Sequence, residues 1–271
     1  MNILEKIVAH KRREVAERKE LYPVRLLEKS IYFHTPVVSL VKYVLRPDKS
    51  GIIAEFKRRS PSKGPINLYA SVEQVSIGYM QAGASALSVL TDREFFGGRN
   101  EDLVEARRFN FCPILRKDFV IDEYQLFEAR SIGADAVLLI AECLSSAEVR
   151  HLASRAAELG LEVLMEVHSA AQLSKLCPGV DLVGVNNRNL ENFTVSLENS
   201  LALADLIPPE MVRISESGLS DPADVLRLRQ AGFQGFLIGE HFMATADPAK
   251  ACNLFVQQLV RLAGQPASAH A

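Results

Sequence analysis

Eight short runs of mostly apolar residues recur along the middle of the chain, and this repetition limits the possible folds more than any other feature. The spacings of about 20 to 35 residues leave room for one helix between consecutive runs. Strands that alternate with helices predict a parallel sheet. The runs are residues 52–56, 86–90, 113–115, 136–140, 163–165, 182–185, 212–214 and 235–238.

The segments between these runs carry helix-start signals. Ser145 and Glu148 have the spacing of a capping box, in which each residue's side chain bonds the other's backbone N–H. The same spacing recurs at Ser71 with Gln74, at Ser169 with Gln172, and an aspartate precedes a proline at Asp221-Pro222 and at Asp247-Pro248. Glycines that can end a helix precede four of the runs, at Gly83, Gly133, Gly160 and Gly232.

Eight strands with intervening helices can form an open sheet or a closed barrel. No G-x-G-x-x-G motif follows the first run, which disfavours an open dinucleotide-binding sheet. The 271 residues also lie near the ~250 typical of a (βα)₈ barrel. We therefore predict the α/β class and one TIM barrel domain: extra N-terminal helices in residues 1–50, the barrel in 51–262, and a frayed tail in 263–271.

The N-terminal segment combines a sparse apolar stripe with many charges. Ile3 and Ile7 begin the stripe, and a basic cluster occupies residues 10–13. Mixed-sign runs are typical of a solvated helix face. We expect this cluster to face solvent, although it could also contact an anion.

Charge and cysteine content exclude several classes of protein. With 31 Lys and Arg against 33 Asp and Glu, the chain lacks the basic excess that nucleic-acid binding needs. It has no apolar run of membrane-spanning or signal-peptide length, so we expect a cytoplasmic protein without a membrane partner. The cysteines, at positions 112, 143, 177 and 252, form no C-x-x-C pair, and we expect buried thiols and no metal site. We expect a monomer or a weak homo-oligomer.

In a (βα)₈ barrel, polar residues at the carboxyl ends of strands face the active site. Ile53, Glu55 and Lys57 share one face of the first strand, because side chains alternate along a strand. Other strand ends supply Lys117, Glu166, Asn186, Arg188 and Glu216. Lysines and glutamates held close in a partly buried pocket are suited to proton transfer. A salt-bridge network at the barrel rim is the alternative.

Glycine and serine at other strand ends indicate a phosphate site. Barrels often bind phosphate on the backbone of the loops after strands seven and eight. Here these loops contain Ser217-Gly218 and Gly239, and Ser60 lies in the loop after the first strand. His168 has no partner at metal-ligand spacing, so we expect a polar histidine at the pocket rim.

The strand-end motifs together resemble the indole-3-glycerol-phosphate synthase family, whose members are barrel enzymes of tryptophan biosynthesis. The resemblance covers the whole barrel and the N-terminal extension. The matching segments are residues 54–64 (AEFKRRSPSKG), 113–119 (PILRKDF), 133–140 (GADAVLLI), 162–168 (EVLMEVH), 184–190 (GVNNRNL), 215–218 (SESG) and 236–239 (FLIG).

The resemblance implies closure of an indole ring on 1-(2-carboxyphenylamino)-1-deoxyribulose 5-phosphate, with loss of CO₂ and water and no cofactor. Lys117 would be the general acid, and Glu166 would move a proton in the dehydration. Lys57 would bind the substrate's anionic groups, while Glu55 would position Lys57 and stabilise positive charge on the anilino nitrogen. The other implied contacts are Asn186, Arg188 and Glu216 to substrate polar groups, Phe96, Phe119 and Leu138 to the ring, and Ser60, Ser217, Gly218 and Gly239 to phosphate.

One departure concerns the phosphate site. Many relatives place a small residue after the glycine that corresponds to Gly239, whereas this chain has Glu240 and then His241. A carboxylate beside a phosphate repels it unless the side chain points away, so we assign this contact to backbone N–H groups. The alternatives are another phosphosugar barrel, such as phosphoribosylanthranilate isomerase or a Schiff-base aldolase, and a catalytically inactive barrel that serves as an interaction module.

Overall fold

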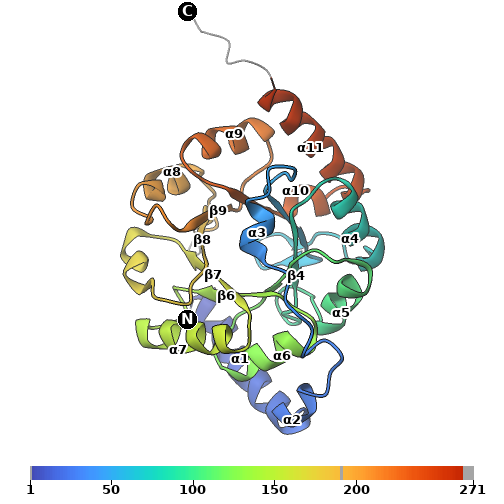
Figure 1. The fold of residues 1–271 in the computed structure, drawn as a ribbon, viewed down its shortest axis with the longest axis vertical. Helices are drawn as coiled ribbons and strands as arrows, with labels where there is room; N and C mark the ends of the chain where they lie inside the picture. Colours follow the sequence, from blue (N-terminus) through green and yellow to red (C-terminus); the bar gives the residue numbers. More distant parts are fainter. Residues whose placement is uncertain (1, 190–191, 265–271) are drawn as a thin grey trace, which may run out of the picture.

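The computed structural model describes residues 2–189 and 192–264, and within them eight parallel strands close into a barrel (Figure 1). The first strand pairs with both its successor and the last strand, which confirms the predicted TIM barrel. Leu190 and most of the predicted tail, residues 265–271, lie outside the described residues. The barrel strands are β1 (Ile52–Phe56), β4 (Ala86–Leu90), β5 (Ile114–Lys117), β6 (Ala136–Ile140), β7 (Glu162–Val167), β8 (Leu182–Asn186), β9 (Val212–Glu216) and β10 (Gly235–Ile238).

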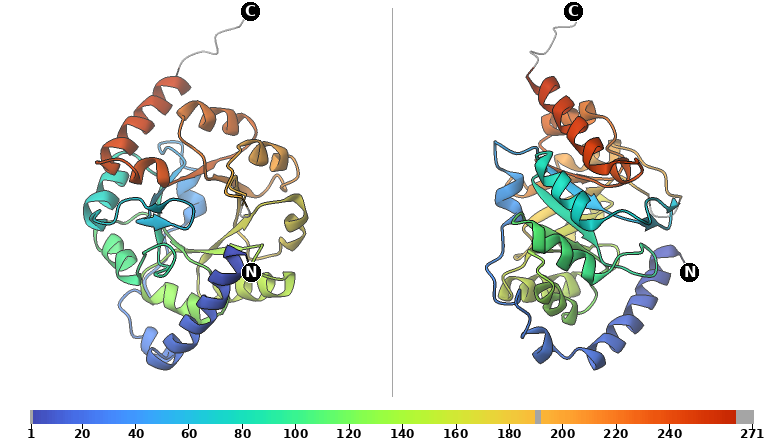
Figure 2. Two further views of the ribbon diagram at one scale, coloured as in Figure 1. Left: turned by 180° about the vertical axis from the view of Figure 1, so that it is seen from behind. Right: turned by 90° about the vertical axis from the view of Figure 1, so that its right-hand side faces the viewer.

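Helices surround the barrel and connect its strands (Figures 1 and 2). They are α4 (Val72–Gln81), α5 (Asn100–Phe109), α6 (Tyr124–Ser131), α7 (Ser146–Glu158), the 3₁₀ helix η1 (Ala170–Lys175), α8 (Glu198–Ala204), α9 (Pro222–Gln230), α10 (Glu240–Met243) and α11 (Pro248–Ala263). A small hairpin of β2 (Arg59–Ser60) and β3 (Gly64–Pro65) follows β1. No helix within residues 2–189 and 192–264 has the length and apolarity to cross a membrane.

The segment before β1 forms α1 (Ile3–Leu21), α2 (Val24–Leu27) and α3 (Leu40–Val44). In Figure 1, α3 lies in front of the barrel, and the view from behind in Figure 2 shows α1 along the edge of the opposite opening. Leu40 and Val44 of α3 pack with the residues that fill the barrel. The N-terminal extension therefore contacts both ends of the barrel.

Most of the predicted helix starts are confirmed. Ser145 and Glu148 form a complete capping box, and the Asp221 and Asp247 side chains each accept a backbone N–H in the first turn of a helix. The prediction at Ser169 is wrong, because its side chain makes no capping bond. Gln172 instead accepts the backbone N–H of His168, at 2.6 Å, and a short 3₁₀ helix replaces the α-helix.

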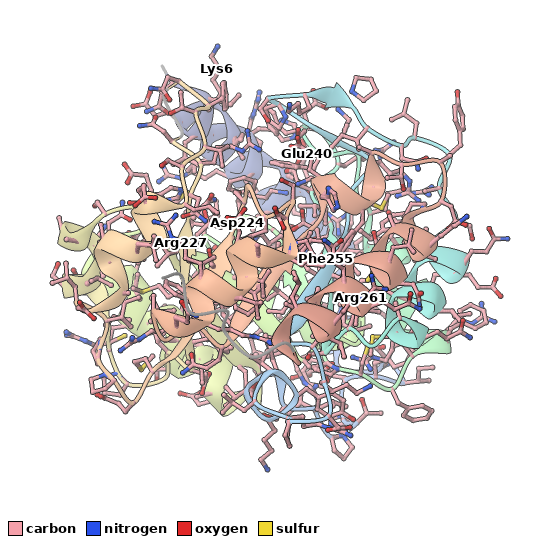
Figure 3. All side chains as sticks on the ribbon, turned by 90° about the horizontal axis from the view of Figure 1, so that it is seen from above. Lys6, Asp224, Arg227, Glu240, Phe255 and Arg261 are labelled. Atoms are coloured by element: carbon pink, nitrogen blue, oxygen red, sulfur yellow. The ribbon has the colours of Figure 1, made fainter. Side chains whose placement is uncertain are left out.

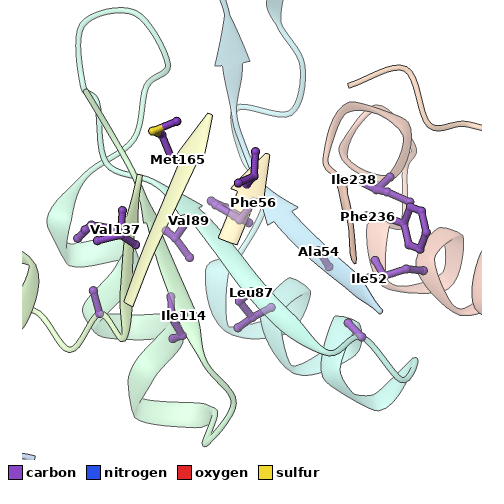
Figure 4. Packing of buried hydrophobic residues seen from close by; sticks show 14 of the residues in the cluster. Ile52, Ala54, Phe56, Leu87, Val89, Ile114, Val137, Met165, Phe236 and Ile238 are labelled. Carbon is purple, nitrogen blue, oxygen red and sulfur yellow. The ribbon is translucent and has the colours of Figure 1, made fainter. Parts of the chain in front are cut away.

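Alternating side chains along the strands build two apolar layers. Ile52, Ala54 and Phe56 of β1 face outward and pack with the surrounding helices (Figure 4). Ile53 faces inward with Leu115 and other branched residues of the barrel interior. Because these branched side chains close the interior, the polar side chains that follow them gather at the carboxyl ends of the strands.

Two expectations about buried residues need correction. Lys11 of the basic cluster does not face solvent, because it is only 1% exposed and forms ion pairs with acidic side chains of the barrel. Cys112 and Cys252 are buried as expected, but Cys143 and Cys177 are only partly buried. No group of His, Cys, Asp or Glu side chains in the described part of the chain is arranged to hold a metal ion.

Candidate active site

A cavity of about 720 Å³ opens at the carboxyl ends of the barrel strands. Apolar side chains cover one part of its wall, and charged or small polar residues cover the rest. All of the site residues predicted from the sequence line it: Glu55, Lys57, Ser60, Phe96, Lys117, Phe119, Leu138, Glu166, Asn186, Arg188, Glu216, Ser217, Gly218 and Gly239. The fold thus brings together residues from all along the barrel.

Lys117 lies between two carboxylates at the base of the cavity. Its Nζ lies 3.0 Å from Oε2 of Glu166 and 2.6 Å from Oε2 of Glu216. Lys117 and Glu216 are the last residues of β5 and β9, and Glu166 is the last but one of β7, so three separate strands fix the positions of one ammonium and two carboxylates. Asn186 also donates to the other oxygen of Glu166, at 3.1 Å.

The buried cluster separates the pKa values of the two carboxylates. Burial alone raises the pKa of Glu166, but Lys117 and His168 outweigh it and lower this pKa to about 2. Burial, together with repulsion from Glu166, raises the pKa of Glu216 to about 7 despite the attraction of Lys117. For Lys117, burial lowers the pKa, but Glu216 and Glu166 overcome it and hold the pKa above its usual value. Lys117 is therefore an ammonium, and Glu216 exchanges a proton near neutral pH.

A second ion pair comes from the first strand. Glu55 is buried, its Oε1 accepts a hydrogen bond of 2.8 Å from Lys57 Nζ, and its Oε2 accepts one of 3.3 Å from Ser88. Glu55 lies in β1 and Lys57 directly follows its last residue, Phe56, and both side chains line the cavity, as predicted.

Two glycines leave the space that these glutamates occupy. A Cβ at Gly184 would lie 2.1 Å from Oε1 of Glu216, and a Cβ at Gly239 would lie 2.5 Å from Oε1 of Glu55. Neither position tolerates a side chain while the carboxylate stays in place. Gly184 was not a predicted site residue, because in the sequence it is an ordinary glycine within a strand.

Glu240 lies at the mouth of the cavity and is neutralised by two cations. Its carboxylate is 3.2 Å from Nη2 of Arg188 and 3.4 Å from Nζ of Lys63. In Figure 3, Glu240 lies toward the end of the barrel that carries α1 and the β2–β3 hairpin. The Glu240 side chain thus faces the cavity instead of pointing away from it.

The loop after β9 has unusual backbone geometry. Ser217 and Gly218 have φ values of 70° and 79°, a region that residues other than glycine rarely adopt. Asn187 holds this turn by donating to the carbonyl of Ser217 at 3.1 Å. A Cβ at Gly218 would lie 2.4 Å from Val195, so the loop approaches its neighbour closely.

The apolar part of the wall includes side chains of the N-terminal helix, which the sequence did not place at the site. The predicted Phe96 and Phe119 have ring centroids 5.9 Å apart. Ile3, Leu4 and Ile7 of α1 also line the cavity. Their i, i+4 spacing indicates an apolar helix face, but nothing in that spacing shows which surface of the barrel the face covers.

Comparison with known proteins agrees with this arrangement. The family model described as indole-3-glycerol phosphate synthase matches residues 4–255, nearly the whole of the described chain. The chain belongs to the indole-3-glycerol phosphate synthase family. The resemblance found in the strand-end motifs is thereby confirmed. Enzymes of this family are carboxy-lyases of tryptophan biosynthesis.

Curated members of the indole-3-glycerol phosphate synthase family match over almost their full length. The synthase of Bacteroides thetaiotaomicron is 50% identical over 258 residues, which cover 95% of this chain and 99% of that protein. The synthase of Laribacter hongkongensis is 44% identical over 255 residues, covering 92% and 97%. The matched region includes both the barrel and the N-terminal extension.

A solved structure outside the synthase family shares the fold. Thiamine phosphate pyrophosphorylase from Pyrococcus furiosus superposes with a TM-score of 0.59 at 17% identity, covering 84% of this chain and 100% of that one. At this identity the likeness concerns the barrel alone.

His168 is the last residue of the matching segment 162–168, and its ring lies beside Glu166, one of the two carboxylates that pair with Lys117. Its Nε2 is 3.5 Å from Oε1 of Glu166, and its side chain is largely buried. The expected position at the pocket rim is therefore wrong, since the ring packs against a cluster residue and does not line the cavity.

Proposed function

We propose that this chain closes an indole ring on 1-(2-carboxyphenylamino)-1-deoxyribulose 5-phosphate and releases CO₂ and water. The ring carbon that carries the carboxylate attacks the ketone carbon of the sugar chain. The carboxylate then leaves as CO₂, which returns its bonding electrons to the ring, and the hydroxyl formed from the ketone leaves as water. The product is indole-3-glycerol phosphate, as expected for a member of this family.

The observation that carries the proposal is the position of Lys117 between Glu166 and Glu216 at the base of a cavity with an apolar and a charged wall. Attack on a ketone needs a proton donor at the developing alkoxide, and later loss of water needs a group that removes a proton. Lys117 supplies the first and Glu166 the second.

The charge state of Lys117 favours this reaction over a Schiff-base aldolase. A lysine must be a neutral amine to attack a carbonyl. The neighbouring glutamates instead raise the pKa of Lys117 above its usual value and keep it protonated. The side chain is therefore a proton donor and not a nucleophile.

Glu55 and Lys57 act on the amino end of the reacting system. Lys57 lies 2.8 Å from Glu55, so the pair can hold the substrate's carboxylate and stabilise positive charge on the anilino nitrogen. Loss of CO₂ becomes easier when the carboxylate is desolvated beside this cationic nitrogen.

The two walls set the orientation of the substrate. The benzoate ring lies among Phe96, Phe119 and Leu138, and the phosphate lies opposite, near Ser60 and the backbone of the loops at Ser217, Gly218 and Gly239. Asn186 and Arg188 hold the hydroxyls and the carboxylate between these ends, and Glu216 supports them through Lys117.

Proton transfer by these side chains needs no metal or organic cofactor, and we propose that the reaction uses none. The phosphorylated substrate is then the only small-molecule partner in turnover. The cytoplasmic location and the monomer or weak homo-oligomer expected from the sequence stay predictions.

The test is direct assay of chelator-treated, purified protein with the carboxyphenylamino-deoxyribulose phosphate. Because the chain contains no tryptophan, the fluorescence of the indole product is measured against a low background. We expect saturable product formation at micromolar substrate. A folded sample that makes no product, or one whose lysine is trapped by borohydride in the presence of substrate, contradicts the proposal.

A further inference from the structure

Lys11 of α1 is buried within a group of acidic side chains. Its Nζ lies 3.0 Å from Asp92 Oδ2, 3.0 Å from Asp118 Oδ1 and 2.7 Å from Glu14 Oε2. A buried ammonium is costly unless carboxylates surround it, and these three do so. Asp92 and Asp118 belong to the barrel, so Lys11 links the N-terminal helix to two barrel loops.

The same two aspartates fix the backbone of the aromatic wall. The other oxygen of Asp92 accepts the backbone N–H of Phe96 at 3.2 Å, and Oδ1 of Asp118 accepts that of Phe119 at 2.8 Å. Lys11 therefore contacts both carboxylates that hold the two phenylalanines. The phenylalanine rings lie 5.9 Å apart in the cavity wall.

The helix that carries Lys11 also contributes to this wall. Ile7, one turn before Lys11, lines the cavity together with Ile3 and Leu4. Figure 2 shows this helix along the edge of the barrel opening. The Lys11 ion pairs thus sit where the helix, the β4–α5 loop and the end of β5 meet.

We propose that Lys11 is a positioning residue that holds Phe96 and Phe119 at the spacing needed to bind the benzoate ring of the substrate. The proposal rests on the proposed function for the identity of the ring. Lys11 does not line the cavity itself and acts through Asp92 and Asp118, of which Asp118 does line it. Its effect should fall on binding of the ring end and not on the phosphate end or the proton transfers.

The test compares Lys11→Met with Arg18→Met. Arg18 lies on the same helix and pairs with Glu128 of α6 and with Glu14, so its variant removes ion pairs of this helix without a direct contact to Asp92 or Asp118 being lost. We expect Lys11→Met to raise KM about tenfold with kcat changed less than about threefold, because ring binding is lost equally from ground and transition states. We expect Arg18→Met to leave both within about twofold.

Two ligands test the ring end and the phosphate end of the cavity separately. Binding of 2-aminobenzoate, followed by its own fluorescence, should weaken about tenfold in Lys11→Met, while inhibition by inorganic phosphate stays within about twofold of wild type. If Lys11→Met does not fold, Asp92→Asn takes its place. Its amide keeps the oxygen that holds Phe96 but cannot pair with the Lys11 ammonium.

Several results would overturn the proposal. These are unchanged 2-aminobenzoate affinity in Lys11→Met, an equal rise of KM in Arg18→Met, or equal weakening of phosphate. Wild-type protein that forms no indole product contradicts the proposed function, and the 2-aminobenzoate comparison still decides the role of Lys11. A wild-type protein that does not bind 2-aminobenzoate overturns the role of Lys11 as well.

Discussion

Glu216 lies 2.6 Å from Lys117, closer than Glu166 does at 3.0 Å, although Glu216 is 99 residues from Lys117 in the sequence and Glu166 only 49. One ammonium therefore serves two buried carboxylates. The single Lys117 ammonium stabilises two negative charges less well than it would stabilise one, and the two carboxylates repel each other. Their pKa values are therefore separated. This shared arrangement holds Lys117 in its charged form.

Replacement of Lys117 should abolish turnover. Lys117→Ala removes the proton donor, and we expect kcat to fall about 10³-fold, within the usual range for general acid catalysis. Lys175→Ala is a matched control, because Lys175 bonds two backbone carbonyls outside the cavity. It should leave kcat unchanged. Near wild-type kcat in folded Lys117→Ala, checked by circular dichroism, would remove Lys117 from the mechanism.

The raised pKa of Glu216 makes the stability of the fold depend on pH. An unfolded glutamate ionises near its ordinary pKa of 4.5, whereas folded Glu216 ionises near 7. The folded state therefore loses stability as pH rises from about 4.5 to about 7. Glu216→Gln removes this loss. The difference obtained by subtracting the wild-type Tm from the variant Tm should therefore be more positive at pH 8 than at pH 5, by about 3 °C or more. An equal Tm difference at both pH values would mean that Glu216 titrates normally.

Gly184 should be required for activity and not only for folding. A Cβ there would lie 2.1 Å from Glu216, so Gly184→Ala must displace that carboxylate from Lys117. We expect kcat to fall about tenfold or more, since small misplacements of catalytic groups are costly. Gly160→Ala is the control: its φ of 73° costs about 1–2 kcal/mol of stability, but it has open space around it and no site contact. Equal kcat values for the two variants would argue against this prediction.

Glu240 should weaken phosphate binding, because its carboxylate directly follows Gly239 and neutralises two cations at the mouth of the cavity. Removing its charge frees Arg188 and Lys63, and we expect Glu240→Gln to lower the inhibition constant of inorganic phosphate about threefold at low salt. Glu198→Gln, which affects an exposed pair with Arg227, should have no effect. A higher inhibition constant in Glu240→Gln would show that Glu240 organises the phosphate site instead.

The barrel and the strand-end residues could be predicted because both follow from local patterns. Apolar runs separated by capped helices indicate (βα) units, and the two-residue period of a strand places Glu55 and Lys57 on one face. The barrel rule then directs attention to strand ends, where Lys117, Glu166 and Glu216 lie. Local propensity was insufficient at Ser169, where Gln172 bonds the backbone of His168 and a 3₁₀ helix forms.

The sequence by itself determined the order of the barrel strands and helices and the strand-end residues that reach the cavity. Only the tertiary structure decided which of those residues pair. In the sequence, Lys11 is one charge in a basic cluster, and Gly184 is an ordinary glycine of a strand. Closure of the barrel places Asp92 and Asp118 beside Lys11, and it places the Glu216 carboxylate where a Cβ of residue 184 would lie. Periodicity acts over a few residues, whereas the energy of a buried ion pair depends on distances between segments that only the closed barrel brings together.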